Sequence, residues 1–151
     1  MASWLVYWTP ADVEEFEGRA NFRMDCLGSG TENFGSKFSK GDTVWIHSID
    51  SWGHHSILGK LTLVEYVTSR EEAEDRIGRH LSNVRFTNYW IAEKPWNSIK
   101  DVPFSEVPHS LEFESGKKLP PDYSGKHFQS QRRLTAEDNL MILDLWNAWT
   151  E

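Results

Sequence analysis

The chain has 151 residues, the size of one compact domain, with a formal net charge of −7 and a single cysteine. The acidic balance argues against a protein that coats nucleic acid by charge alone, and one cysteine excludes an internal disulfide. No leader segment and no apolar run of about 18 residues is recognisable, so we expect one cytoplasmic domain over residues 1–151 with no membrane partner.

The N-terminal half predicts short strands joined by loops. Strands are expected at residues 3–8, 43–48 and 57–67, where aromatic and β-branched residues recur. Thr9 and Pro10 predict the cap and first turn of a short helix that ends at Gly18. Residues 28–39 predict a loop with one helical turn. Gly59, inside the third strand, indicates a bulge or a close backbone approach.

The C-terminal half begins and ends with predicted helices. Ser69 and Gly78 are expected to cap a short charged helix over residues 70–77. Thr135 opens the last helix, with Asp138 at the position that completes a capping box. Extended segments are predicted at residues 84–92 and 107–113, and a surface loop at residues 115–126.

Several short strands with helices at both ends and in one insertion predict the α+β class. This order does not repeat a strand–helix–strand unit, as a parallel sheet would require. It fits a small, mixed, partly open β-barrel flanked by short helices.

Eight tryptophans are unusual in a domain of this size. Trp52 lies in a polar loop between two predicted strands, where its neighbours cannot bury it and a flat base could stack on it. The alternative is that Trp52 folds back on the body of the domain. Trp8 and Trp90 end or interrupt strands and fit either a pocket or the core. The remaining tryptophans with strand or helix periodicity are predicted core residues: Trp4, Trp45, Trp146 and Trp149.

Basic side chains gather in residues 117–133, interleaved with one phenylalanine and amide side chains. Such a mixture suits phosphate contacts together with hydrogen bonds to base edges. The alternative is a solvated, charged loop. The expected phosphate contacts are Lys117, Lys126, Arg132 and Arg133.

No catalytic or metal-binding set is recognisable. His47, His54 and His55 lie close in sequence, but adjacent histidines on a strand face opposite sides and no zinc-site spacing occurs. Cys26 follows Asp25, and a neighbouring carboxylate disfavours the reactive thiolate. We therefore expect a binding domain without enzyme activity, cofactor or metal. An enzyme acting on nucleic acid would need Asp25 or His47 in the cleft beside Trp52.

The order of several short motifs resembles the EVE and YTH domains of the PUA-like superfold. Segments similar to EVE domains are residues 4–10 (WLVYWTP), 21–23 (NFR), 38–48 (FSKGDTVWIHS) and 58–64 (LGKLTLV). Segments similar to YTH domains are residues 89–91 (YWI), 100–103 (KDVP), 107–109 (VPH) and 128–134 (FQSQRRL). Residues 69–82 depart from the YTH pattern because they lack aromatic residues, which argues against reading methyladenine in a YTH cage.

Domains of this kind bind nucleic acid and hold one modified base, flipped out of the strand, between aromatic walls. The resemblance therefore implies that the ligand is DNA or RNA with a modified, methylated base. Phe22 and Trp52 would form walls of the pocket, with Trp8 and Trp90 as further candidates. The groups that would offer hydrogen bonds to the base edge are Thr9, Asn21, Ser48 and Gln129.

We expect a monomer, and a nuclease or processing enzyme that acts on the bound strand is compatible with this function. The alternative is a module of the same fold that binds a small molecule or a protein. That alternative predicts that replacing Arg132 and Arg133 together leaves ligand affinity unchanged.

Overall fold

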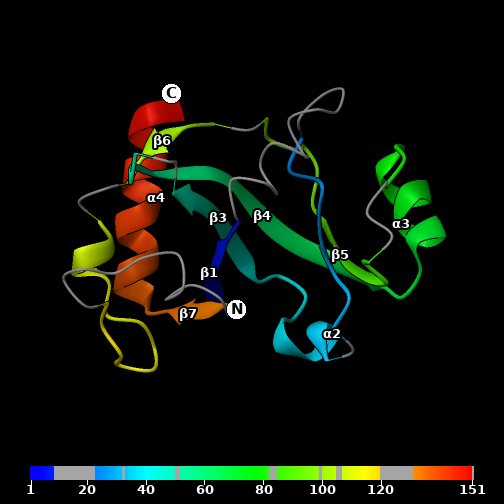
Figure 1. The fold of residues 1–151 in the computed structure, drawn as a ribbon, viewed down its shortest axis with the longest axis horizontal. Helices are drawn as coiled ribbons and strands as arrows, with labels where there is room; N and C mark the ends of the chain where they lie inside the picture. Colours follow the sequence, from blue (N-terminus) through cyan, green and yellow to red (C-terminus); the bar gives the residue numbers. More distant parts are fainter. Residues whose placement is uncertain are drawn as a thin grey trace.

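The computed structural model describes residues 1–8, 23–31, 33–49, 52–81, 85–98, 100–104, 107–119 and 131–150. Its strands are β1 (Ser3–Tyr7), β2 (Cys26–Ser29), β3 (Thr43–Ile49), β4 (His55–Val67), β5 (Asn88–Ala92), β6 (Val102–Pro103) and β7 (Arg132–Leu134). Its helices are α2 (Phe34–Lys37), α3 (Arg70–Ile77) and α4 (Ala136–Thr150), with a 3-10 turn η1 at Pro108–Ser110 (Figure 1). The helix expected after Thr9 and Pro10 lies outside the described residues.

The described strands form one mixed sheet in the order β2-β5-β4-β3-β1-β7, and β6 lies beside the first half of β4. Strands β1 and β3 are parallel, and the other pairs are antiparallel. The long strand β4 pairs with β3 over residues 55–62 and with β5 over residues 63–67. Among these strands no pairing joins β2 to β7, so the sheet is open. The α+β class is confirmed.

Helix α4 packs at one end of the sheet and α3 at the other, as Figure 1 shows. Strand β3 is buried on both faces, which is why its alternating residues do not divide into a polar and an apolar set. The core on the α4 side includes Leu5, Trp45, Ile57, Phe104, Ile142 and Trp146. The core on the other side includes Val6, Met24, Val44, Ile46, Leu58 and Trp90. None of the described helices is long and apolar enough to span a bilayer.

The capping signals of α3 and α4 are confirmed. The Ser69 hydroxyl accepts a hydrogen bond from the Glu72 amide (3.1 Å), and Gly78 ends α3 with φ of 71°. The Thr135 hydroxyl accepts from the Asp138 amide (3.0 Å), and the Asp138 carboxylate accepts from the Thr135 amide (3.1 Å). The buried Asp138 carboxylate also accepts from the amides of Glu112 and Phe113, so the cap anchors the preceding segment as well.

The bulge expected at Gly59 is confirmed. The register between β3 and β4 shifts opposite it, between Ile46 and His47, which is a bulge. A Cβ at Gly59 would also collide with the Met24 side chain, so another segment approaches closely here.

Some expected elements differ. Residues 28 and 29, expected to begin a loop, are the last two residues of strand β2. The strand forms because β5 supplies the pairing partner and Gly28 makes room for the rings of Phe86 and Tyr89. Regular strand begins at residue 88 rather than 84. Pro108 starts a 3-10 turn inside the segment that was expected to be extended. Trp149 is 60% exposed, since the apolar face of α4 meets the sheet only up to Trp146.

Candidate nucleic-acid interface

The ends of β1 and β3 meet at one edge of the sheet, because the strands are parallel and pair as far as Tyr7 opposite His47. Beyond that pair, the Trp8 amide donates to the His47 carbonyl (2.9 Å), and the Ser48 hydroxyl donates to the Trp8 carbonyl (2.8 Å). These bonds hold Trp8 and Ser48 side by side. A hydroxyl that donates one hydrogen bond keeps lone pairs that can accept from a ligand.

The loop after β3 returns the chain to β4 at this same edge, with Ser48 opposite Ser56. Trp52 lies in the loop and is 83% exposed. Gly53, directly after it, has φ of 81°, a left-handed conformation that favours glycine. An indole face open to solvent can stack on a flat ligand. Three of the expected pocket residues, Trp8, Ser48 and Trp52, therefore lie at one edge.

Of the other expected pocket residues, the structure describes Trp90, which does not lie at this edge. Trp90 is 6% exposed in the core, and its ring centroid lies 5.4 Å from that of Tyr66. Its indole therefore presents no open face for stacking in this conformation. The residues that lie outside the described ranges are Thr9, Asn21, Phe22, Gln129 and the expected phosphate contact Lys126.

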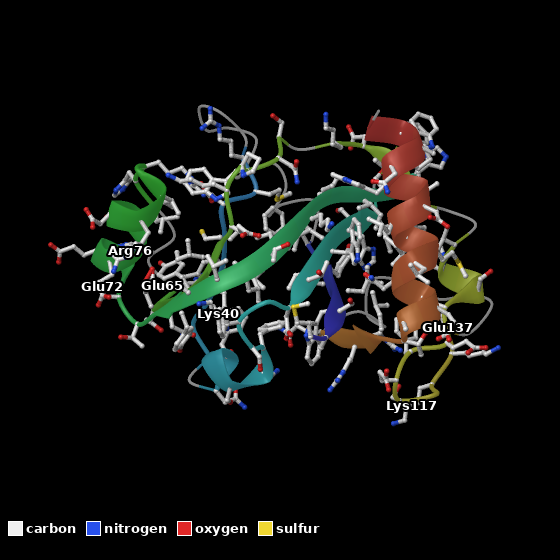
Figure 2. All side chains as sticks on the ribbon, turned by 180° about the vertical axis from the view of Figure 1, so that it is seen from behind. Lys40, Glu65, Glu72, Arg76, Lys117 and Glu137 are labelled. Carbon is white, nitrogen blue, oxygen red and sulfur yellow. The ribbon has the colours of Figure 1, made fainter. Side chains whose placement is uncertain are left out.

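Lys117, Arg132 and Arg133 lie near the N-terminal end of α4, where Figure 2 places Lys117 close to Glu137. The Arg132 guanidinium lies 4.8 Å from the centre of the Phe113 ring and donates to the Lys117 carbonyl (3.1 Å). Burial lowers the pKa of Arg132. Arg132 thus has a structural role, whereas the side chains of Lys117 and Arg133 are exposed.

These basic residues and Trp52 are separated along the sheet. Arg132 pairs with Leu5, and Leu5 pairs with Trp45, four residues before β3 ends at Ile49. At about 3.3 Å per residue, roughly 13 Å of strand lies between Arg132 and the start of the Trp52 loop. A base at Trp52 and a phosphate at Arg132 or Arg133 would therefore belong to different nucleotides.

A buried pair of histidines lies behind the edge. His47 is fully buried, and its ring is nearly parallel to that of His55 at 6.4 Å. Burial, with a smaller effect from His55, lowers the pKa of His47 to about 3, so its ring is neutral at pH 7. A ring buried in the core does not face Trp52 as a general base. The described residues include no group of three or more side chains that could hold a metal ion.

Asp25, the other candidate for acid–base chemistry, is also buried. Its carboxylate accepts two hydrogen bonds from the Arg79 guanidinium, at 2.6 and 2.7 Å. Burial acts to lower the pKa of Arg79, but the hydrogen bond and charge of Asp25 outweigh that effect and raise it. The ion pair joins the chain after α3 to the start of β2. Cys26 beside it is a buried thiol, as expected.

A hollow that the sequence analysis missed lies between the chain before β2 and the chain after β5. Its lining residues are Arg23, Lys94, Pro95, Trp96 and Ser98. The Lys94 ammonium lies 4.9 Å from the centre of the Trp96 ring. One sequence signal points to this hollow: a lysine and a tryptophan on either side of a proline at the end of a strand. Arg23 is remote in sequence, and a bridge to Ser98 brings it to the hollow.

No protein-family model matches this chain, and no curated protein matches it in sequence. The structure is similar to the solved N-terminal domain of Thermococcus gammatolerans McrB bound to m5C DNA. The sequence identity is 13%, the TM-score is 0.57, and 100% of each chain is covered. The likeness agrees with the PUA-like fold that the sequence motifs imply. This chain therefore shares its fold with a domain that was solved bound to m5C DNA.

Proposed function

We propose that this chain is an EVE/YTH-type binding module that holds a modified base of a nucleic acid at the edge formed by Trp8, Ser48 and Trp52. The observation that carries the proposal is the exposed Trp52 indole, in the loop that follows the Ser48 end of β3, on a fold shared with a domain bound to m5C DNA. The first ligand to test is therefore DNA that contains 5-methylcytosine.

The energetics of a flipped base suit this edge. Extruding a base from a duplex costs a few kcal/mol, and stacking on an aromatic side chain returns about 1–3 kcal/mol per base. The Ser48 hydroxyl can accept a hydrogen bond from an exocyclic amino group such as that of cytosine. Desolvating one methyl group adds about 0.8 kcal/mol, which favours the methylated base.

The proposed activity is binding without catalysis. His47 and Asp25, the side chains that an enzyme on this site would need, are both in the core. We further propose that the protein acts as a monomer in the cytoplasm, and that a nuclease or processing enzyme uses the recognition it provides. Chemical change of the nucleic acid would then belong to that partner.

Fluorescence anisotropy at low salt tests the proposal. Labelled oligonucleotides of one sequence, with a single cytosine either plain or 5-methylated, are titrated as single strands and duplexes, in DNA and in RNA. We expect the methylated site to bind roughly fourfold or more tightly, and Trp52→Ala to weaken binding. A parallel series with N6-methyladenine tests the other common methylated base.

Equal affinity for every modified and plain oligonucleotide, or no binding to any of them, would contradict the proposal. Either result would favour the alternative, a module of the same fold that binds a small molecule or a protein.

A further inference from the structure

We infer that the hollow lined by Arg23, Lys94, Pro95, Trp96 and Ser98 holds a backbone phosphate of the same nucleic acid strand. This inference rests on the proposed function and adds a contact site to it. Arg132 and Arg133 lie on β7, at the side of the sheet away from β5, so the cations of the hollow form a separate group.

The hollow is fixed by hydrogen bonds on both sides. The Met24 amide donates to the Asn97 carbonyl (2.8 Å), next to the bridge between Arg23 and Ser98. The Trp96 indole nitrogen donates to the Ala92 carbonyl (3.0 Å), which holds the loop after β5 against its own strand. A surface that is ordered before the ligand arrives loses little conformational entropy on binding.

The charges in the hollow favour an anion. No carboxylate is among the lining residues that the structure describes, and Glu93 and Asp101, both exposed, lie on the same segment outside that lining. In the described part of the chain, neither the exposed Arg23 nor the exposed Lys94 side chain makes an ion pair, and the Lys94 ammonium lies over the Trp96 ring. Two cations in one concave surface create a local positive potential on a chain of net charge −7.

The chemical groups that line the hollow are of the types that bind a phosphodiester. A guanidinium donates two parallel hydrogen bonds to phosphate oxygens, and an ammonium adds a point charge. The tryptophan and proline beside them provide an apolar floor on which the adjoining sugar or base can lie.

The hollow lies at the side of β4, the strand that the Trp52 loop enters at its start. After the hollow, the chain follows β4 toward that loop: the Lys100 amide donates to the Leu58 carbonyl (2.9 Å), and Val102 pairs with Ile57. Figure 1 shows this stretch crossing the top of the molecule between β5 and β6. From Lys60, whose carbonyl accepts from the Asn97 side chain (3.5 Å), back to the start of β4 is about 17 Å of strand, a span that a few nucleotides of one strand can cover.

The test removes both cations in the double variant Arg23→Gln with Lys94→Gln. Its charge-matched control is Lys37→Gln with Lys40→Gln, which changes two exposed lysines around α2, away from the hollow. The affinity of each protein for the m5C oligonucleotide is measured by anisotropy across a salt series, after thermal unfolding has confirmed that it folds. We expect the hollow variant to bind roughly tenfold more weakly and its log–log salt slope to fall by about 0.9 per lost phosphate contact. The control should match the wild type.

A scan with single neutral methylphosphonate linkages locates the contact. One linkage should weaken binding to the wild type but not to the hollow variant, since the two changes then remove the same interaction. Unchanged affinity and slope in the hollow variant, with a wild type that binds, would overturn this inference and leave the proposed function intact. A wild type that binds no oligonucleotide contradicts the proposed function instead.

Adding inorganic phosphate alone tests the alternative that the hollow binds free anions rather than the backbone of a nucleic acid. If phosphate raises the melting temperature of the wild type but not of the hollow variant, while oligonucleotide binding is the same for both, the hollow binds free anions and the inference is wrong.

Discussion

The Ser48 hydroxyl donates a 2.8 Å hydrogen bond to the Trp8 carbonyl, across the ends of two parallel strands. The Trp8 amide in turn donates to the neighbouring His47 carbonyl. Together the two bonds extend the β1–β3 pairing by one residue and fix the backbone at the edge where Trp52 emerges. The Ser48 side chain thus helps to fix the shape of the proposed base site, and its hydroxyl can also accept a hydrogen bond from the ligand.

Ser48→Ala should lower the free energy of unfolding by about 1 kcal/mol, because the partly buried hydrogen bond from the Ser48 hydroxyl to the Trp8 carbonyl is lost. The matched control is Ser36→Ala, where an exposed hydroxyl donates to the Asn33 carbonyl at 2.9 Å. Urea unfolding of both variants measures the difference. A midpoint for Ser48→Ala no lower than that of Ser36→Ala would contradict the role given to this bond.

Trp52→Ala should weaken binding of the modified oligonucleotide by about 1–3 kcal/mol, roughly 5- to 150-fold, through the loss of stacking. Stability should change little because the ring is 83% exposed. Trp52→Phe keeps an aromatic face and should restore most of the affinity. Leu140→Ala, which removes a side chain that is 57% exposed on α4, controls for a general loss of apolar surface. Equal affinities of all three variants would remove Trp52 from the site.

Variants of the adjacent arginines Arg132 and Arg133 on β7 should distinguish a structural role from a role in binding. Arg132→Gln removes the contact with the Phe113 ring and should lower stability by about 0.5–1 kcal/mol. Arg133→Gln should leave stability nearly unchanged because its side chain is exposed. If Arg133 also contacts a phosphate, its variant lowers the salt slope of binding by about 0.9. Unfolding curves and salt titrations of the two variants give both quantities, and identical stability would contradict the structural role of Arg132.

Local signals were enough to predict the elements whose ends are set by neighbours in sequence. Ser69 and Gly78 bound α3, and Thr135 with Asp138 opens α4, because a cap is a contact between residues a few positions apart. Strand β2 was missed because its four residues become a strand only by pairing with β5, more than fifty residues later.

In the candidate site too, features with a local sequence signal could be predicted and features set by distant segments could not. The exposure of Trp52 follows from the polar loop around it, which the sequence displays directly. The burial of Trp90 depends on Tyr66 and the strands beside it, and the hollow depends on Arg23 meeting Ser98. Neither relationship has a local signature, since both are set by strand order and register.

Asp25→Asn should destabilise the protein by about 3–5 kcal/mol, because the variant leaves the Arg79 guanidinium without its buried counter-charge. The control is Glu65→Gln, which breaks the ion pair with Arg76 that Figure 2 shows beside α3. Both partners of that pair are 42% exposed, so the change should have little effect. Thermal or urea unfolding compares them. Similar small losses in both variants would mean that the Asp25 pair is no more important to the fold than a surface contact.

The acid sensitivity of this protein should depend on His47. Its pKa in the folded protein, about 3, lies below its ordinary value of 6.5 because the ring is buried. Below pH 6.5 the unfolded chain therefore binds a proton that the folded chain does not, so this group favours unfolding more strongly as the pH falls toward 3. Between pH 7 and pH 5 the loss from this one group is about 2 kcal/mol.

His47→Gln removes this dependence, although it also lowers stability at pH 7 by disturbing the core. The relevant measurement is the change in unfolding free energy between pH 7 and pH 5, which should be smaller in the variant than in the wild type by about 2 kcal/mol. His54→Gln, at an exposed histidine in the Trp52 loop, should keep the wild-type change. If His47→Gln and the wild type lose stability equally over this range, the His47 ring takes up its proton in the folded state, and the core around it is open to water.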